Sequence, residues 1–207
     1  MPDRPVYLML LASGIERLRF AHYLAALSPV LAGLGGCHLA MAPAPTVELF
    51  GHQEAPQSLL LSHWPDLETL RGFWTSPNYQ SIAKSRNVSG ELLAVALEDP
   101  QHSSAPEVPD AALAVFLGAG PSPALLEAAG ARTLTLVRER QVEALEGNWR
   151  HGDVAIYAWP TAQGARQQLV TFSSGQRGRA LLVPALPSIR SPSRQADPEG
   201  IAASVAA

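Results

Sequence analysis

The sequence predicts an α+β fold in which two ferredoxin-like βαββαβ repeats close on each other as a pseudo-dimeric α+β barrel within one chain. The first observation behind this prediction is a set of short segments that recur at a nearly constant offset. The second is an alternation of apolar runs with helical patterns in both halves. The third is that the apolar runs lack the polar alternation of a sheet with one face in water.

Three short segments of the first half recur in the second half, and one of them contains tryptophan, of which the chain has four. Each segment and its counterpart are 94 or 95 residues apart. The pairs are Ser28-Pro29 with Ser122-Pro123, Val47-Glu48 with Val142-Glu143, and Trp64-Pro65 with Trp159-Pro160. A constant offset over this stretch predicts a tandem repeat. The second copy is degenerate, since it lacks the first two turns of its opening helix.

The first copy begins with an apolar run at 6–11, which predicts a strand. Ser13 and Glu16 have the spacing of a capping box, so a helix is expected to begin at Ser13. Pro29 is expected to kink or restart this helix, and Gly35 and Gly36 to end it.

The rest of the first copy predicts an interrupted second strand at 37–42 and 47–50, followed by strands at 58–63 and 92–97. Between the last two, Asp66 is expected to cap a helix. Ser76 and Pro77 are expected to begin another short helix, as N-cap and first helical residue. The order is therefore β-α-β-β-α-β.

The apolar runs at 6–11, 59–61, 92–97, 113–117 and 154–159 predict strands that are buried on both faces. Helices would cover one face of each sheet, and the natural cover for the other face is the sheet of the sister copy. Burial of apolar surface contributes roughly 25 cal/mol per Å². Burying these second sheet faces would therefore more than offset the closure entropy of a short linker. This predicts two sheets that close face to face.

Stretches rich in proline, serine and other loop-forming residues predict the domain boundaries. Residues 1–98 form repeat one and 111–191 form the degenerate repeat two, joined by a Pro- and Ser-containing linker at 99–110. Residues 192–207 have little to bury and are expected to be a disordered tail.

Composition limits the function classes. The formal net charge is −3, which argues against nucleic-acid and anionic-membrane partners. The longest N-terminal apolar stretch, 6–12, is too short for a membrane span and lacks a cleavage site. Cys37 is the single cysteine, is expected to be buried, and forms no intrachain disulfide. A cytoplasmic protein is expected.

The first copy also carries the string Phe73-Trp74-Thr75-Ser76-Pro77-Asn78-Tyr79, followed by Arg86. With Tyr23, Gly35-Gly36, Glu48 and Trp64-Pro65, this string resembles the aromatic-x-Ser-Pro-x-Tyr…Arg signature of domain-of-unknown-function family 1330. That family belongs to the dimeric α+β barrel superfamily, so the resemblance implies a barrel and no particular reaction. The second copy keeps Trp159-Pro160 but lacks the Ser-Pro-Tyr string.

The candidate ligand-binding residues are His22, Tyr23, Tyr79 and Arg86. Tyr79 and Arg86 share one helical face, where Arg86 would anchor a carboxylate and Tyr79 would donate a hydrogen bond. In the alternative, structural interpretation, which is favoured, Ser76 caps the helix, Pro77 opens it, and Arg86 pairs with an acid such as Glu91.

Glu48 and Glu143 hold matching positions near strand ends. Either could act as a base, but their repetition favours a shared structural role at a strand edge. The six histidines form no metal-binding motif, so neither a metal nor a cofactor is expected, although haem binding through His22, His38 or His63 stays open.

The sequence supports two functional hypotheses. One is a protein that binds a small aromatic or carboxylate ligand in a cleft of the first repeat and is possibly a cofactor-independent enzyme. The other is a non-catalytic structural or ligand-sensing barrel, which a solidly packed interior without a ligand-sized cavity would favour. Further pairing of the pseudo-dimer as a homodimer is left open.

Overall fold

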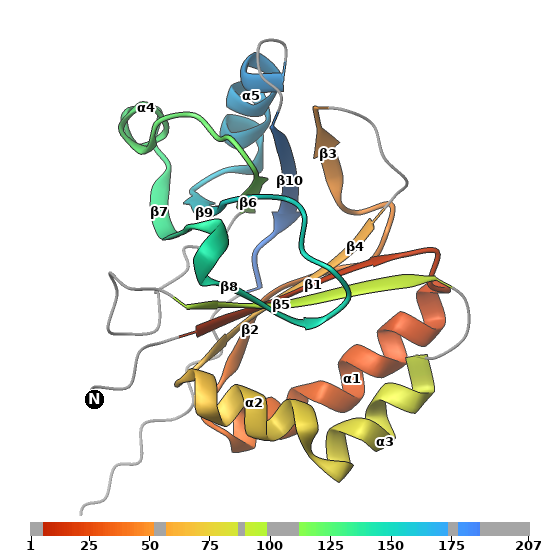
Figure 1. Cartoon of the computed structure of the whole chain (residues 1–207). Coiled ribbons are helices and arrows are strands. Elements are labelled where there is room, and N and C mark those ends of the chain that lie inside the picture. The colour runs from red at the N-terminus through yellow and green to blue at the C-terminus, as the bar shows by residue number, and fades with distance from the viewer. Residues whose placement is uncertain (1–5, 52–56, 87–89, 99–111, 174–177, 187–207) are drawn as a thin grey trace, which may run out of the picture.

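The computed structural model describes residues 6–51, 57–86, 90–98, 112–173 and 178–186 (Figure 1). The elements of the N-terminal half are β1 (Val6–Ser13), α1 (Arg17–Gly33), β2 (Cys37–Ala42), β3 (Glu48–Phe50), β4 (Gln57–Trp64), α2 (Leu67–Thr75), α3 (Pro77–Arg86) and β5 (Glu91–Glu98). Those of the C-terminal half are β6 (Ala112–Leu117), α4 (Pro123–Ala128), β7 (Arg132–Val137), the 3-10 turn η1 (Glu139–Gln141), β8 (Val142–Glu146), β9 (Val154–Trp159), α5 (Ala162–Ser173) and β10 (Arg179–Pro184).

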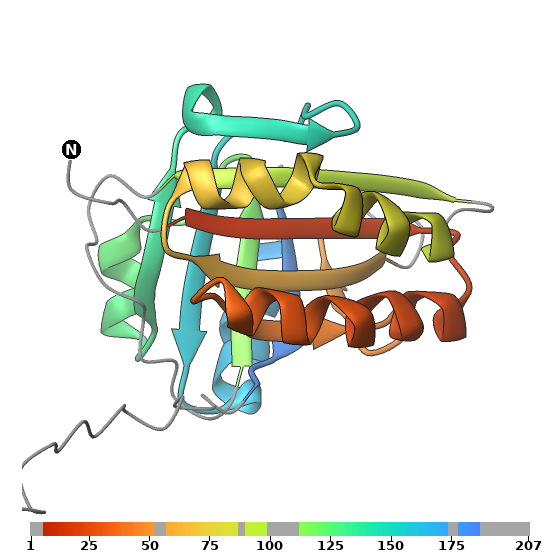
Figure 2. The same cartoon turned by 90° about the horizontal axis from the view of Figure 1, so that it is seen from below.

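The strands form two five-stranded antiparallel sheets. The N-terminal sheet has the order β2-β4-β1-β5-β8, and the C-terminal sheet has the order β3-β10-β6-β9-β7. Helices α1, α2 and α3 cover the outer face of the N-terminal sheet, as Figure 2 shows from below. Helices α4 and α5 pack on the outer face of the C-terminal sheet. The molecule is therefore a mixed α+β fold of two sheets with helices outside.

Each sheet contains one strand from the other half of the chain. Strand β8 pairs with β5, where Glu143 lies opposite Ala96. Strand β3 pairs with β10, where Glu48 lies opposite Leu182. The expected interrupted strand at 37–50 is therefore wrong, because β2 and β3 belong to different sheets. A turn in which the Thr46 N–H donates to the Pro43 carbonyl (2.9 Å) redirects the chain between them.

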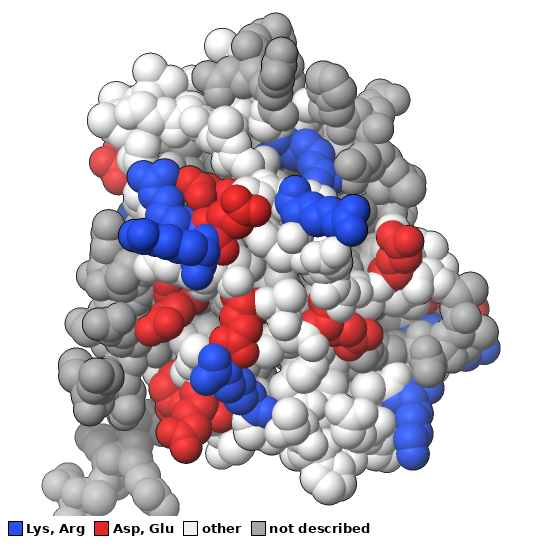
Figure 3. All heavy atoms as spheres, in the orientation of Figure 1, with Lys and Arg blue, Asp and Glu red and all other residues white. Residues whose placement is uncertain are grey.

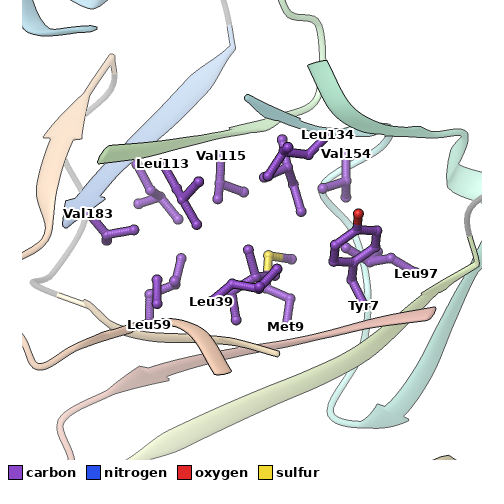
Figure 4. Close-up of a cluster of buried hydrophobic side chains, with 14 of the residues drawn as sticks. Tyr7, Met9, Leu39, Leu59, Leu97, Leu113, Val115, Leu134, Val154 and Val183 are labelled. Atoms are coloured by element: carbon purple, nitrogen blue, oxygen red, sulfur yellow. The ribbon is translucent and has the colours of Figure 1, made fainter. Parts of the chain in front are cut away.

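The space between the two sheets is filled by apolar side chains (Figure 4). Along β1, Tyr7 and Met9 point into this interior, whereas Leu8 and Leu10 point toward the helices. All four side chains are at most 2% exposed. This confirms that continuous apolar runs are buried on both faces, one by helices and one by the opposite sheet.

Helix α1 differs from the prediction at both its start and its middle. Strand β1 extends through Ser13, Gly14 turns the chain with φ +70°, and Glu16 is the N-cap without a side-chain hydrogen bond. Ser13 therefore caps no helix. Pro29 lies inside a continuous α1, so the predicted restart is also wrong. Tertiary packing of this apolar face against the sheet stabilises the helix despite the proline.

The remaining boundary residues behave as predicted. The Asp66 carboxylate accepts the Thr69 N–H (2.6 Å) and so caps α2. After α1, Gly35 has φ +79°, and the Gly36 N–H donates to the Leu31 carbonyl (3.0 Å), which closes the helix end. Cys37, expected to be buried, is exposed, because it is the first residue of β2 and precedes the buried part of that strand.

Several local structures recur 95 residues apart. The register of β2 on β4 shifts between His38 and Ala40, and that of β7 on β9 shifts between Thr133 and Thr135. The Ala44 N–H donates to Ser58 Oγ (2.8 Å), and the Glu139 N–H donates to Asp153 Oδ1 (2.9 Å). The turn from Pro43 to Thr46 recurs from Arg138 to Gln141, where the N–H···O distance is 2.8 Å.

The predicted linker at 99–110 and the predicted tail at 192–207 lie outside the described residues. In the described ranges no helix is long and apolar enough to cross a membrane. On the face seen in Figure 3, acidic and basic side chains are interspersed.

Candidate functional site

Two of the predicted ligand-binding residues meet under α1 and α3. The hydroxyls of Tyr23 and Tyr79 lie 3.2 Å apart, and their residues are 0% and 1% exposed. Trp74 stacks on the ring of Tyr79 with a centroid distance of 4.2 Å, and Phe73 contacts its edge at 5.0 Å. The two tyrosines therefore join the helices to the sheet through an aromatic cluster, with their hydroxyls paired inside it.

The Ser-Pro motif has the structural role that the sequence predicted. Ser76 Oγ accepts the Tyr79 N–H (3.1 Å) and donates to the Phe73 carbonyl (2.6 Å), which joins the end of α2 to the start of α3. Pro77 is the first residue of α3, where its missing N–H has no helical partner to lose. This capping orients Tyr79 toward the aromatic cluster.

The other two predicted residues do not join this pair. His22 is exposed on α1, one residue before the buried Tyr23. The side chain of Arg86 lies outside the described part of the structure, as does any pairing with Glu91. A cleft lined by all four residues stays a prediction. The small cavity nearby has about 10 Å³ and is lined by residues including His38, Ser62 and Trp64, room for about one water molecule.

Glu48 and Glu143 form ion pairs between the halves. The Arg166 guanidinium on α5 donates to Glu48 from Nε and Nη2, both at 2.6 Å. Arg71 on α2 binds Glu143 in the same way, with an Nε–Oε1 distance of 2.8 Å. Each arginine therefore binds the strand that its sheet receives from the other half. Neither arginine was predicted from the sequence, although Arg71 and Arg166 are also 95 residues apart.

A much larger hollow lies elsewhere, where both halves meet. Its volume is about 560 Å³, within the range of small-molecule sites. Its wall consists of the end of β1, the start of β5 and the β8–β9 loop, namely Leu11, Ser13, Glu91, Leu92, Leu93, Gly147, Asn148, Arg150 and His151. We call it the loop hollow.

The β8–β9 loop is held in place by its own side chains and by close packing on β5. The indole N–H of Trp149 donates to the Gly152 carbonyl (2.9 Å). Gly147 and Gly152 have φ of +79° and +77°, which favours glycine at both ends of the loop. A Cβ on Gly147 would lie 3.0 Å from the Leu92 carbonyl oxygen. The loop therefore presents its polar side chains on a fixed backbone.

The loop hollow offers mainly hydrogen-bond donors. With the Asn148 amide oxygen turned toward Arg150, it accepts from Nη2 and Nε at 3.0 and 3.1 Å, which aligns the guanidinium. Nη2 of Arg179 contacts Nδ1 of His151. Since arginine only donates, Nδ1 of His151 accepts in this contact. Glu91 supplies the one carboxylate among the lining residues.

This site was not predicted from the sequence. His151 counted only as one of the six histidines without a metal-binding motif, and no prediction was attached to Asn148 or Arg150. The available signal was the polar and aromatic stretch 148–151 between two glycines, directly after a strand. This pattern indicates a loop with a fixed backbone, but it does not indicate which strands form the opposite wall of the hollow.

The buried histidines lie away from the loop hollow. Burial lowers the pKa of His38 to about 4, and burial also lowers the pKa of His63. Neither ring nitrogen of His38 has a hydrogen-bond partner among the described residues. Among all the residues that the structure describes, no group of three or more His, Cys, Asp or Glu side chains could hold a metal ion.

Comparison with known proteins finds a family model that matches the N-terminal half of the chain. Residues 5–99 match the family described as Domain of unknown function (DUF1330), which confirms the resemblance indicated by the Ser-Pro-Tyr string. No curated protein matches the chain.

Solved structures resemble the chain over most of its length at low identity. An anthrone oxidase-like protein is 8% identical, with 89% of this chain and 92% of that chain covered and a TM-score of 0.46. A candidate monooxygenase from Fusobacterium nucleatum subsp. nucleatum is 8% identical, with 90% and 94% covered and a TM-score of 0.46. A candidate monooxygenase from Lactobacillus acidophilus NCFM is 6% identical, with 89% and 99% covered and a TM-score of 0.41.

Proposed function

We propose that this chain is an internally duplicated, pseudo-dimeric α+β barrel that binds a small carboxylate in the loop hollow. The observation that carries the proposal is the position of Arg150. Its guanidinium is aligned by Asn148 at the wall of a hollow of about 560 Å³. A planar guanidinium with unused donors is the protein group best suited to bind a carboxylate in two places at once.

The neighbouring groups support the same ligand class. His151 lies beside Arg150 in the same wall, and Arg179, which contacts it, adds positive charge behind it. Leu11, Leu92 and Leu93 provide an apolar wall that suits a hydrocarbon or aromatic body. Glu91 faces the same hollow and suits a hydroxyl or amino substituent of the ligand.

The duplication is supported by the recurrence of structure as well as sequence. The register shifts, the side-chain contacts of Ser58 and Asp153, and the Arg–Glu ion pairs recur at the same offset of 95 residues, as do Glu48 and Glu143 of the two exchanged strands. In this proposal residues 1–98 and 111–191 are the two repeats. The loop hollow then uses residues of both repeats.

The proposal is tested by calorimetric titration of the full chain with benzoate, phenylacetate and succinate. We expect saturable binding of at least one, with at least a tenfold weaker binding of the corresponding neutral amide. Arg150→Ala should weaken binding at least tenfold, and Arg150→Lys should recover part of the loss because the charge remains. Arg140→Ala, an exposed arginine in η1 at the far end of β8, is the matched control and should change nothing.

The second candidate function is a non-catalytic structural or sensing module. The observation that favours it is the solid apolar interior between the sheets, in which the labelled side chains of Figure 4 are nearly all fully buried. Failure of all three carboxylates to bind, or equal binding by the Arg150→Ala variant, would overturn the carboxylate proposal and leave this alternative.

A further inference from the structure

A second hollow lies against the outer face of the C-terminal sheet, beside the start of α4. Its volume is about 370 Å³. The floor is formed by Leu136 of β7 and by Ala155 and Tyr157 of β9, and the rim by the loop at 118–123 together with Arg138 and Asp153. None of these residues lines the loop hollow. We call it the short-helix hollow.

The short-helix hollow lies where the two halves differ. Helix α1 has 17 residues and α4 has 6. Figure 1 shows the difference in length. Pro29 of α1 and Pro123 of α4 hold matching positions. The turns of α1 before Pro29 have no counterpart in α4. In the N-terminal half, these turns cover the corresponding end of the sheet, where Leu60 holds the place that Ala155 holds in β9.

In the N-terminal half, side chains of α1 cover the sheet end that corresponds to the short-helix hollow. These side chains indicate which chemical class of ligand the hollow can bind. Phe20 and Tyr23 of α1 are 1% and 0% exposed, and the Tyr23 hydroxyl is paired with that of Tyr79. The covered sheet end therefore accepts aromatic rings and one phenolic hydroxyl. In the C-terminal half, a smaller residue, Ala155, stands at the same position and leaves room for a ring.

The charged groups at the rim neutralise each other. Asp153 Oδ2 accepts from Arg138 Nη1 (2.7 Å), and Oδ1 accepts the Glu139 N–H. The Glu139 N–H, followed by Arg138, lowers the pKa of Asp153, so this carboxyl stays ionised and balances the guanidinium. A rim without uncompensated charge favours a neutral ligand.

The floor supplies one hydroxyl. Tyr157 is 1% exposed, and its ring is held edge-on by Phe116 at 5.5 Å. Burial and, less strongly, the charge of Glu127 raise the pKa of Tyr157 to about 12. The phenol therefore keeps its proton at neutral pH and can donate or accept a hydrogen bond. The nearby Glu127 charge disfavours an anion at this position.

We propose that the short-helix hollow binds a neutral aromatic alcohol of the phenol class, whose ring takes the place that Phe20 and Tyr23 fill in the other half and whose hydroxyl meets Tyr157. The site is separate from the carboxylate site, so either can be present without the other.

The test uses 2-naphthol as the probe, titrated into the full chain and followed by calorimetry. We expect saturable binding, with 2-naphthoate at least tenfold weaker in this hollow. Ala155→Trp should fill the hollow and weaken 2-naphthol binding at least tenfold. Ala144→Trp, at an exposed position of β8, is the matched control and should bind as the unaltered chain does. Ala155→Leu, which introduces the residue type of Leu60, is the milder second variant and should weaken binding severalfold.

Further arms separate the two sites. Tyr157→Phe should weaken 2-naphthol binding, whereas Arg150→Ala should leave it unchanged while it weakens carboxylate binding. The proposal is overturned if 2-naphthol does not bind the unaltered chain. It is also overturned if both Ala155 variants bind it as tightly as the Ala144→Trp control, or if Arg150→Ala abolishes its binding.

Discussion

Arg166 of α5 holds Glu48 of β3 through two hydrogen bonds of 2.6 Å, although the residues are 118 positions apart in the chain. Glu48 belongs to the strand that the N-terminal half contributes to the C-terminal sheet. Arg71 and Glu143 make the reciprocal contact in the other sheet. Each contributed strand is thus held by backbone pairing with the neighbouring strand. It is also held by an arginine from the helix that covers the receiving sheet.

Charge reversal of one ion pair should disturb the chain, and the swap should restore it. Glu48→Arg places two cations together and should lower the unfolding midpoint in urea. The double variant Glu48→Arg, Arg166→Glu reforms the pair in the opposite sense, so its midpoint should return toward that of the unaltered chain. Glu16→Arg, in the local exposed pair with Arg19 on α1, is the control and should have a smaller effect. Failure of the swap to recover any stability would contradict the contact.

The buried hydroxyls of Tyr23 and Tyr79 should be energetically coupled. Tyr79→Phe removes one hydroxyl from their 3.2 Å contact and should lower the free energy of unfolding by about 1 kcal/mol. The effects of Tyr79→Phe and Tyr23→Phe should add to more than the effect of the double variant, since both remove the same hydrogen bond. Strict additivity in chemical denaturation would show that the hydroxyls do not interact.

Gly36 should be intolerant of a side chain. A Cβ there would lie 2.2 Å from Leu31 Cδ1 and 2.7 Å from the His63 carbonyl oxygen, so the backbone of β4 must move. Gly36→Ala should cost about 1–3 kcal/mol of unfolding free energy. Gly72→Ala, inside α2 with nothing within 4 Å of its Cβ, is the control and should stabilise by about 0.5–1 kcal/mol. Equal effects at the two positions would refute the close packing at the end of α1.

Acid should destabilise the chain through its buried histidines. The pKa of His38 is lowered to about 4, below the value near 6.5 of an unfolded chain, so the unfolded state binds more protons as the pH falls. The stabilising effect of neutral His38 is complete above about pH 6.5 and is lost progressively toward pH 4. This group should account for about 1–3 kcal/mol of that loss.

The measurement is urea unfolding between pH 7 and pH 4. His38→Leu should show a shallower loss of stability with falling pH than the unaltered chain. The exposed histidine variant His22→Gln controls for the loss of one imidazole and should keep the original pH dependence. If His38→Leu shows the same slope as the unaltered chain, His38 is not the group responsible.

The pattern of apolar residues was sufficient to predict the buried sheets. Every second side chain of β1 faces the opposite sheet, and the others face the helices, so an unbroken run such as 6–11 has one arrangement that buries it. The strand exchange could not be predicted in this way. Pro43 and the residues after it show that the chain turns, but pairing of β3 with β10 depends on residues more than 120 positions away.

The candidate site was less predictable than the fold. Tyr23 and Tyr79 were expected to line a cleft, and they do lie together. Their burial follows from the apolar residues Phe20, Leu24 and Leu27 on the same helical face, which bring the ring against the sheet. Arg150 lies in a loop with no recognisable sequence motif. The residues that face it across the loop hollow come from β1 and β5. Only packing of the loop on those strands assembles the site.

The exchange of strands between the halves is tested most directly by nuclear Overhauser effects in the isotope-labelled full chain. The account predicts cross-strand contacts between the backbone protons of Glu48 and Leu182, and between those of Glu143 and Ala96. Contacts that join Glu48 only to strands of residues 6–98, and Glu143 only to strands of residues 112–186, would contradict it.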